Sequence, residues 1–315
     1  MRLRRSDPAK PGLTRSGRRV LDAAGDPVRD PETLDRVKSL VIPPAWKKVW
    51  IAPDPRGHIQ AVGVDAAGRR QYLYHPVWRE QQDRAKFDRV LELAERLPEV
   101  RDRLTADLTG RGLTRTRVLA AVVGLLDMGM FRVGGAESAA REEDPSYGLS
   151  TLRPDHVRTR GGCVILQFVG KSGVEQNAPV GHLEICTVLR DLKRRRRGED
   201  RLFAHWDASA RRWRHVHATT INEYLREISG EEMTAKDFRT WHGTVRAATA
   251  LAEIGPQPTA TARRKAVAGA MREVADLLGN TPAVARASYV DPRVVEAFEQ
   301  GEVAEGEDEV RDLLA

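Results

Sequence analysis

Residues 118–131 read VLAAVVGLLDMGMF and are apolar at nearly every position. A helix that is apolar all round has no face to turn toward water, so it has to be buried. The stretch therefore predicts a buried helix. Upstream, apolar residues recur at a helical period over Val77–Leu97, opposite a charged face, which predicts another helix. From Ile185 onward the patterns are again mostly helical.

The N-terminal part of the chain has the texture of strands. Val49–Ile51, Ile59–Val64 and Gln71–Tyr74 are short β-branched or aromatic runs separated by turn residues. This spacing predicts a small antiparallel sheet of hairpins. Residues 1–35 are rich in Pro, Gly, Arg and Asp, and we expect them to form an irregular arm with turns.

A hairpin is also predicted within the helical part. Cys163–Phe168 alternates, Gly170–Gly173 turns the chain and Val174–Val180 returns, while Phe203–Val216 is expected to form a second hairpin or a loop. The fold class is therefore α+β, with two domains. We expect an N-terminal β-sheet domain over residues 1–90 and a mainly α-helical domain with a short hairpin sheet over 91–315.

The charge distribution indicates a polyanionic partner. The 315 residues carry a formal net charge of +7, and 41% of them are apolar, as in a globular protein. Residues 296–315 contain eight acidic residues and one arginine, a net of −7, so the other residues carry +14. A body this basic favours DNA or RNA, although ribosome binding or solubility would give the same charge. We expect the acidic tail to be a solvated end, the alternative being a segment that competes for the DNA-binding surface.

Several classes of protein are disfavoured. No apolar run is long enough to span a bilayer, and the N-terminus lacks the apolar stretch of a secretory signal. Cys163 and Cys186 form no Cys-x-x-Cys pair, so we expect a cytoplasmic protein with both cysteines in the core. The Gly170-Lys171-Ser172 tripeptide is no phosphate loop, because Ile165 stands where that loop needs glycine. No metal-ligand spacing occurs, and no cofactor is expected.

Three basic residues at the ends of apolar elements are candidates for a site. Arg132 directly follows Phe131 and is either a helix C-cap or a cation held in a cleft. Arg239 stands between Phe238 and Trp241, and a partly buried guanidinium there needs an anionic partner, which is either Asp237 or another carboxylate, or a phosphate. Lys171 at the hairpin tip would ordinarily be a solvated turn residue.

The C-terminal stretch DLLGNTPAVARASYVDP contains two more candidates. One helix is predicted to end at Gly279 and the next to begin around Thr281–Pro282, a good N-cap followed by a first-turn proline. Asn280 lies in the break, and Tyr289 follows nine residues later. Taken alone, Tyr289 is more simply interpreted as a core or surface tyrosine.

The joint order of these stretches is more informative than any one of them. Along nearly its whole length the chain resembles the small type IB DNA topoisomerases of bacteria and poxviruses. The matching motifs are IPPAW at 42–46, GRRQYLYH at 68–75, FRVGG at 131–135, YGLSTL at 147–152, FVGKSG at 168–173, KDFRTW at 236–241 and GNTPAVARASY at 279–289. The resemblance implies a β-sheet domain and a helical catalytic domain that clamp duplex DNA, relaxing supercoils through a 3′-phosphotyrosyl intermediate without ATP or metal.

The resemblance also assigns roles to the site residues. Tyr289 corresponds to the nucleophile, Arg132 and Arg239 to paired arginines on the scissile phosphate, and Lys171 to the general acid. The viral enzymes have a histidine where this chain has Asn280. An amide keeps a neutral hydrogen-bonding role at that position, but it is unsuited to proton transfer.

Two basic segments are further candidates for DNA contacts. Arg69, Arg70, Tyr72 and Tyr74 form a basic and aromatic strand, interpreted either as a plain edge strand or as a sheet laid in the major groove. The run Lys193–Arg197 is interpreted as a solvated loop that touches phosphates weakly and affects salt dependence more than chemistry.

Two other kinds of protein remain open on the sequence. Tyrosine recombinases share the arginine, lysine and tyrosine chemistry, but they have a helical domain where this chain has its N-terminal sheet module. A non-catalytic DNA-binding protein on the same fold would not need all five site positions. We therefore expect a monomeric, nucleoid-associated topoisomerase with duplex DNA as its partner, and no membrane or obligate protein partner.

Overall fold

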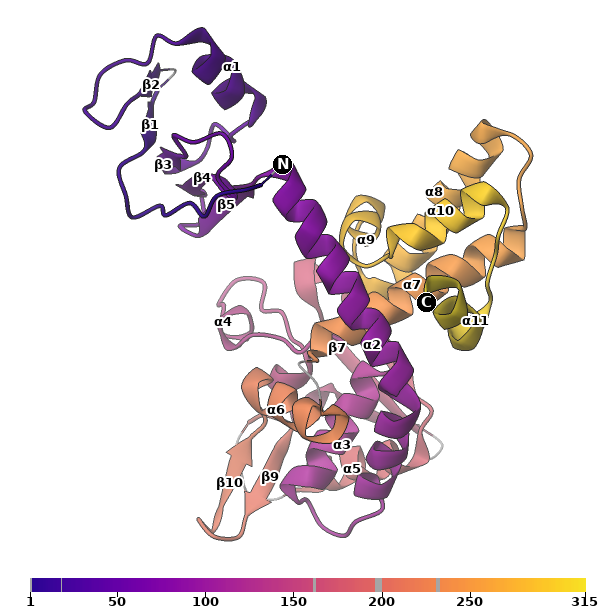
Figure 1. Cartoon of the computed structure of the whole chain (residues 1–315). Coiled ribbons are helices and arrows are strands. Elements are labelled where there is room, and N and C mark those ends of the chain that lie inside the picture. Colours follow the sequence, from indigo (N-terminus) through magenta and orange to yellow (C-terminus); the bar gives the residue numbers. More distant parts are fainter. Residues whose placement is uncertain (1, 18, 161–162, 196–199, 231–232) are drawn as a thin grey trace. The chain divides into compact units, whose positions relative to one another are not determined.

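The computed structural model describes residues 2–17, 19–160, 163–195, 200–230 and 233–315. The chain is α+β and divides into two compact units, Met1–Lys86 and Phe87–Ala315. The strands are β1 Leu13–Ser16, β2 Arg19–Leu21, β3 Lys47–Ile51, β4 Ile59–Val64, β5 Arg70–Tyr74, β6 Val157–Arg160, β7 Cys163–Val169, β8 Glu175–Val180, β9 Ala204–Asp207 and β10 Arg212–His215 (Figure 1). The α-helices are α1 Pro31–Ser39, α2 Pro76–Leu108, α3 Arg115–Leu126, α4 Ala136–Ala139, α5 Leu183–Arg194, α6 Ala218–Ser229, α7 Ala235–Ile254, α8 Ala260–Leu278, α9 Pro282–Ser288, α10 Pro292–Gln300 and α11 Gly306–Leu314.

The N-terminal unit is built on an antiparallel sheet of order β2-β1-β3-β4-β5. The three strands expected from the sequence are confirmed as β3, β4 and β5. The expectation of an irregular arm over residues 1–35 was wrong, because this segment contains β1, β2 and the start of α1. The two strands are only four and three residues long, and each contains one arginine, so their apolar pattern is weak. They form through tertiary pairing, as when Thr14 pairs with Trp50 of β3.

The buried helix α3 lies at the centre of the C-terminal unit. Its residues from Val118 to Val123 are fully buried, and it packs against α5, α6, α7 and β9. The helix ends at Leu126, so its predicted extension to Phe131 was wrong. Asp127 caps α3, and the chain then turns through Gly129, whose φ is 79°. The sequence stays apolar after the helix because this turn is itself packed into the core.

The helix α2 extends beyond the expected end at Leu97 and continues through Pro98 to Leu108. Its apolar stripe runs on through Val100, Leu104 and Leu108, all of which are buried. Burial of this second half explains why the helix persists past a proline. None of the described helices is long and apolar enough to cross a membrane.

The predicted hairpin is confirmed as β7 and β8, which pair in register from Val164 with Val180 to Val169 with Glu175. The strand β6 adds a third member to this sheet, in the order β6-β7-β8. Of the two alternatives for Phe203–Val216, the structure forms the hairpin, β9 and β10. The turn at Lys171–Gly173 carries the lysine at the tip of the first hairpin.

The acidic tail is part of the fold, so its prediction as a solvated end was wrong. Helices α10 and α11 both pack against α7, and Figure 1 shows helices α7 to α11 gathered near the C-terminus. On α11, Val310 and Leu314 are buried, while acidic residues occupy its first turn. Acidic side chains are favourable at a helix N-terminus, which accounts for part of the charge. The expectation of two core cysteines holds for Cys186 but was wrong for Cys163, which is exposed.

Candidate functional site

Two glycines fix the backbone that carries Arg132. The carbonyl of Arg132 accepts a hydrogen bond from the Leu149 amide at 2.9 Å, and that of Val133 accepts one from Ser150 at 2.7 Å. A Cβ atom on Gly148 would lie 2.5 Å from the Gly134 nitrogen, so neither residue of this contact has room for a side chain. The motifs FRVGG and YGLSTL are thus two sides of one junction. Arg132 lies six residues after the last residue of α3, which excludes the C-cap alternative.

The guanidinium of Arg132 contacts three other parts of the site. Its Nη2 donates to Asn280 Oδ1 at 2.6 Å and to the Leu278 carbonyl at 3.3 Å. Its Nη1 donates to the hydroxyl of Tyr289 at 3.4 Å. Arg132 therefore contacts the C-terminal end of α8, Asn280 in the break between α8 and α9, and the tyrosine that follows α9.

Arg239 approaches the same point from α7. Its side chain is only 3% exposed, and it donates to the carbonyls of Met130 at 2.5 Å and Leu278 at 2.6 Å. Its guanidinium carbon lies 5.4 Å from the centroid of the Tyr289 ring. Asp237 is not its partner, because that carboxylate caps α7 and pairs with Arg89 at 3.0 Å. The carboxylate alternative for Arg239 was therefore wrong.

The two arginines lack an anionic partner within the described residues, where no carboxylate pairs with either Arg132 or Arg239. They share the Leu278 carbonyl as acceptor instead. Burial and the positive charge of Arg132 lower the pKa of Arg239 to about 10, so the guanidinium stays protonated at neutral pH. Burying two neighbouring cations costs free energy unless an anion pairs with them. The arrangement is that of an anion-binding site.

Tyr289 is positioned beside these cations by the helix that precedes it and by a contact with α7. Thr281 caps the start of α9 and Pro282 occupies its first turn, as predicted from the sequence. Tyr289 is the C-cap residue of the same helix. The Tyr289 carbonyl accepts a hydrogen bond from Thr244 Oγ1 at 3.3 Å. Burial raises the pKa of the phenol, but the charges of Arg132 and Arg239 outweigh burial, and the net pKa lies below the ordinary value. A phenol that ionises more easily is a better nucleophile.

Asn280 directly follows Gly279, which caps α8 in the left-handed conformation with φ of 57°. Its Oδ1 is used by Arg132, while its Nδ2 is buried and has no hydrogen-bond partner among the described residues. The Nε of Arg239 is likewise buried without a hydrogen-bond partner among the described residues. Buried donors in native proteins are nearly always satisfied, so these two are available to an anionic ligand.

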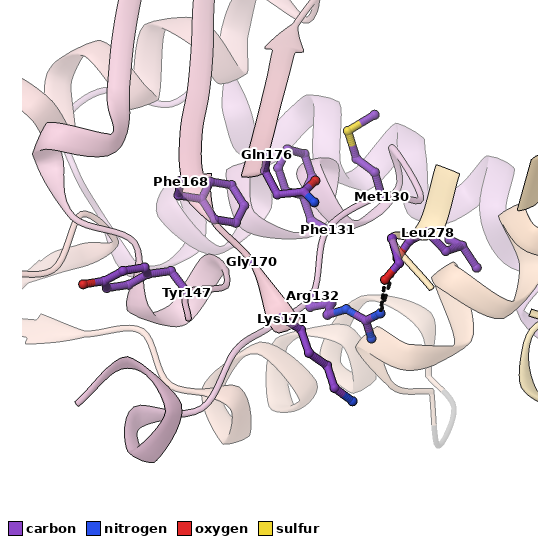
Figure 2. Close-up of a pocket in the computed structure, with 10 residues that line it drawn as sticks. Met130, Phe131, Arg132, Tyr147, Phe168, Gly170, Lys171, Gln176 and Leu278 are labelled. Atoms are coloured by element: carbon purple, nitrogen blue, oxygen red, sulfur yellow. Dashed lines mark hydrogen bonds between the residues drawn. The ribbon is translucent and has the colours of Figure 1, made fainter. Parts of the chain in front are cut away.

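Lys171 reaches the site from the hairpin tip. It is exposed and lines the same pocket as Arg132, Phe168 and Gly279, and Figure 2 shows the Lys171 and Arg132 side chains coming from two different segments of the chain. The structure thus brings together all five predicted residues: Tyr289 and Asn280 contact Arg132, Arg239 lies against the Tyr289 ring, and Lys171 lines the same pocket as Arg132.

The predicted DNA-contacting residues of the N-terminal unit are only partly grouped. Arg70, Tyr72 and Tyr74 alternate along the exposed face of β5, the outer strand, with the two tyrosine rings stacked at 6.0 Å. The guanidinium of Arg70 lies 5.5 Å from the Tyr72 ring centroid. Arg69 precedes the strand and pairs with Asp65, so its inclusion in the strand was wrong.

The expectation that Lys193–Arg197 forms a solvated loop was wrong for the described residues 193–195. Lys193 lies in α5 and donates to the Val157 carbonyl at 2.6 Å. Arg195 donates to the Arg201 carbonyl at 2.6 Å and lies over the Trp213 ring. Arg196 and Arg197 lie outside the described residues.

Sequence reasoning missed two residues that hold Tyr289 against α7. A Cβ on Gly243 would lie 2.7 Å from the Tyr289 carbonyl oxygen, and Thr244 donates to that oxygen. Both lie about one helical turn beyond Arg239 in the stretch FRTWHGT, where a glycine inside a predicted helix, directly after Trp241 and His242, was the available signal. Among the described residues, no group of three or more His, Cys, Asp or Glu could hold a metal ion.

Comparison with known proteins places this geometry in a family. Residues 75–312 match the family model described as "Eukaryotic DNA topoisomerase I, catalytic core", and residues 19–65 match "Bacterial DNA topoisomerase IB, N-terminal domain". The chain is 32% identical to DNA topoisomerase 1B of Acanthamoeba polyphaga mimivirus over 276 residues, covering 84% of this chain and 80% of the viral protein. It is 24% identical to DNA topoisomerase 1B of vaccinia virus (strain Copenhagen), covering 75% of this chain and 71% of that protein.

The electrostatics of the site predict that Arg132→Ala raises the pKa of Tyr289, because one of the two cations that stabilise the phenolate is lost. Tyrosinate absorbance measured against pH reports this, if each protein is compared with its Tyr289→Phe counterpart to isolate Tyr289 from the other tyrosines. The matched control is Arg141→Ala, which removes an exposed arginine. An unchanged Tyr289 titration in Arg132→Ala would contradict the assignment.

Proposed function

The chain belongs to the type IB DNA topoisomerases, and we propose that it relaxes supercoiled duplex DNA by cutting one strand with Tyr289, holding the 3′ end as a phosphotyrosine and resealing it. One observation carries this proposal. The Tyr289 hydroxyl lies 3.4 Å from Arg132, and its ring lies beside Arg239, with neither arginine paired to a described carboxylate. A scissile phosphate is the anion that this pair lacks.

The attack joins the Tyr289 oxygen to phosphorus and breaks the bond from phosphorus to the 5′-oxygen. Negative charge then grows on the non-bridging oxygens of the pentacoordinate transition state. The two guanidiniums offer fixed forks of donors to that charge, and the free Nδ2 of Asn280 adds a neutral donor. The phenol proton passes to solvent, helped by the lowered pKa of Tyr289.

The departing 5′-oxygen needs a proton, because an alkoxide is a poor leaving group. Lys171 supplies it in this proposal, since it is exposed on the hairpin tip and faces the pocket that Arg132 lines. Reversal of the same steps reseals the strand: the 5′-hydroxyl returns its proton and attacks the phosphotyrosine.

The energetics of the proposal require neither ATP nor a metal ion. One phosphodiester is exchanged for another at each step, so the free energy of the cut bond is kept in the tyrosine linkage. Rotation of the cut strand about the intact one then releases supercoiling. The charge stabilisation that a metal would provide is assigned to Arg132, Arg239 and Asn280.

We assign the N-terminal unit to DNA binding. The exposed row of Arg70, Tyr72 and Tyr74 on β5 offers one cation and two aromatic faces to a groove or backbone. Phosphate neutralisation by a basic body would make affinity fall steeply with salt. The protein would then act as a monomer on the nucleoid, with duplex DNA as its substrate.

The proposal is tested by relaxation of a supercoiled plasmid in a buffer that contains EDTA and no ATP. We expect the wild-type protein to relax the plasmid and Tyr289→Phe to be inactive, because only the attacking oxygen is lost. Tyr147→Phe is the matched control, since it removes the hydroxyl of a tyrosine that lines the pocket beside Arg132. Relaxation by Tyr289→Phe, or none by the wild type, would contradict the proposal.

The role of Lys171 is tested by single-turnover cleavage of two substrates. Lys171→Ala should slow cleavage about 100-fold or more on ordinary DNA, the range of positioned proton transfer. The variant should recover on DNA whose bridging 5′-oxygen is sulfur, because a thiolate leaves without a proton. Arg132→Ala and Arg239→Ala should recover less. Equal slowness of Lys171→Ala on both substrates would make the lysine a phosphate ligand instead.

A further inference from the structure

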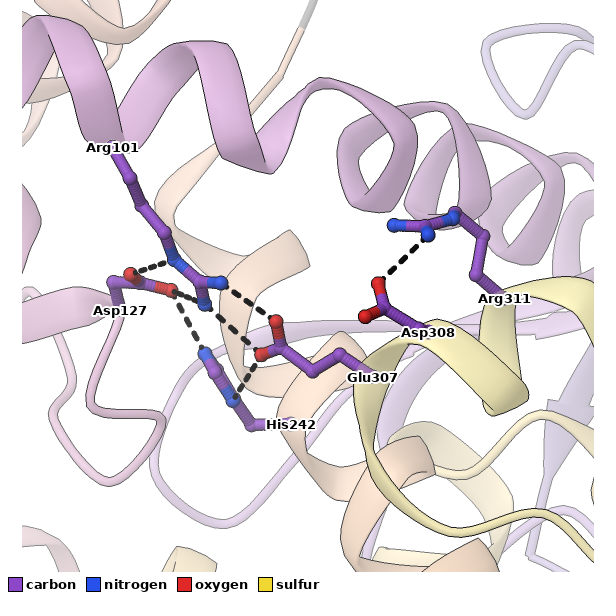
Figure 3. Close-up of polar contacts among 6 residues, drawn as sticks. All are labelled: Arg101, Asp127, His242, Glu307, Asp308 and Arg311. Carbon is purple, nitrogen blue, oxygen red and sulfur yellow. Dashed lines mark hydrogen bonds and ion pairs between the residues drawn. The ribbon is translucent and has the colours of Figure 1, made fainter.

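A cluster of four ionisable side chains joins helices from distant parts of the chain (Figure 3). Arg101 of α2 donates to both oxygens of Asp127, at 2.7 and 2.9 Å, and to both oxygens of Glu307, at 2.7 and 2.9 Å. His242 of α7 lies 3.1 Å from Asp127 and 3.8 Å from Glu307. None of the four residues belongs to the site described above.

The cluster is partly buried and tightly bound. Asp127 is 15% exposed and His242 is 16% exposed. Hydrogen bonds from Arg101 to Glu307 and Asp127 raise the pKa of Arg101 above its ordinary value. Burial raises the pKa of Asp127, but His242 and Arg101 outweigh it and the net pKa lies below the ordinary value. A bidentate guanidinium that serves two carboxylates is among the stronger polar contacts a protein makes.

The turn that begins at Asp127 links this cluster to the site. A Cβ on Gly129 would lie 2.7 Å from the His242 Cβ, so the turn rests directly on that histidine. The next carbonyl, that of Met130, accepts the 2.5 Å hydrogen bond from Arg239. Two residues later the chain reaches Arg132. The cluster therefore holds the short segment that both supports Arg239 and carries Arg132.

Glu307 is the one member of the cluster that comes from the C-terminal helix. It lies in the first turn of α11, whose Val310 and Leu314 are buried and which packs on α7. The Gly306 amide donates to Thr249 of α7 at 3.4 Å. The helix thus presents one carboxylate to Arg101 and His242 while its apolar face is fixed on the helix that carries Arg239.

We propose that Glu307 is a positioning residue for strand cleavage: it closes the cluster with Arg101, Asp127 and His242, and so holds the turn that places Arg132 and Arg239 on the scissile phosphate. The inference rests on the proposed function and extends it to the acidic C-terminal helix. Glu307 acts through the arginines and touches no reacting atom.

The test measures single-turnover covalent capture of DNA by Glu307→Ala at a temperature where melting curves show it fully folded. We expect capture to slow at least about tenfold, with DNA affinity nearly unchanged, because a misplacement of about 1 Å caused by a distant mutation can cost roughly 100-fold. Glu307→Gln, which keeps an acceptor oxygen and the side-chain length, should recover part of the rate. Asp308→Ala is the matched control, since that neighbouring carboxylate is 85% exposed and, among the described residues, forms an ion pair only with Arg311 of the same helix.

A second substrate separates positioning from general weakening of the fold. Replacing a non-bridging oxygen of the scissile phosphate with a methyl group removes charge that the arginines neutralise. The defect of Glu307→Ala relative to wild type should therefore shrink on this methylphosphonate. An equal defect on both substrates would overturn the positioning role, as would wild-type capture by Glu307→Ala or an equal loss in Asp308→Ala. Absence of capture by the wild type would instead overturn the proposed function, and this inference with it.

Discussion

Two guanidinium groups that share one carbonyl and lack a carboxylate partner in the described structure are the constraint on which the site depends. Arg132 and Arg239 both donate to Leu278, the last residue of α8. A helix C-terminus carries partial negative charge, so it steadies two cations without neutralising either. A carboxylate in the same place would satisfy them and close the site to phosphate. Both arginines are thus held by a carbonyl dipole, and in the proposed function their positive charge is available to the scissile phosphate.

The rest of the C-terminal unit serves this arrangement. Gly134 and Gly148 bring two loops into backbone contact, which fixes Arg132 where α3 has already ended. The Thr244 hydroxyl accepts a hydrogen bond from the Asp291 amide and donates one to the Tyr289 carbonyl. These two bonds fix the tyrosine to α7, the helix that also carries Arg239. These contacts are all made between groups of the protein itself, so in the proposed reaction the donors are already fixed where charge would develop, and such preorganisation is the main source of electrostatic catalysis.

Much of the site could be predicted from the sequence, but through the joint order of motifs rather than through single residues. Arg132, Lys171 and Tyr289 each have a simple structural explanation when taken alone, and local patterns could not show that they meet. Backbone carbonyl acceptors leave no signal in the sequence, so Asp237 is a plausible partner for Arg239 on sequence alone. In the structure Asp237 pairs with Arg89 instead. The acidic tail was misjudged because net charge hides the buried pair Val310 and Leu314. Short strands such as β2 were not predicted because they form through pairing with neighbouring strands rather than through local strand propensity.

Covalent attachment of DNA to Tyr289 is the step on which the proposed function depends, and it can be tested by mapping the attachment site. A duplex that loses its short 5′-hydroxyl fragment after cleavage traps the covalent complex, which can be digested with trypsin and analysed by mass spectrometry. Cleavage after Arg286 and Arg293 gives the peptide ASYVDPR, in which Tyr289 is the single tyrosine. We predict that the 3′-phosphate of the DNA is found on this peptide. Attachment to a peptide carrying another tyrosine, or to no tyrosine at all, would contradict the account.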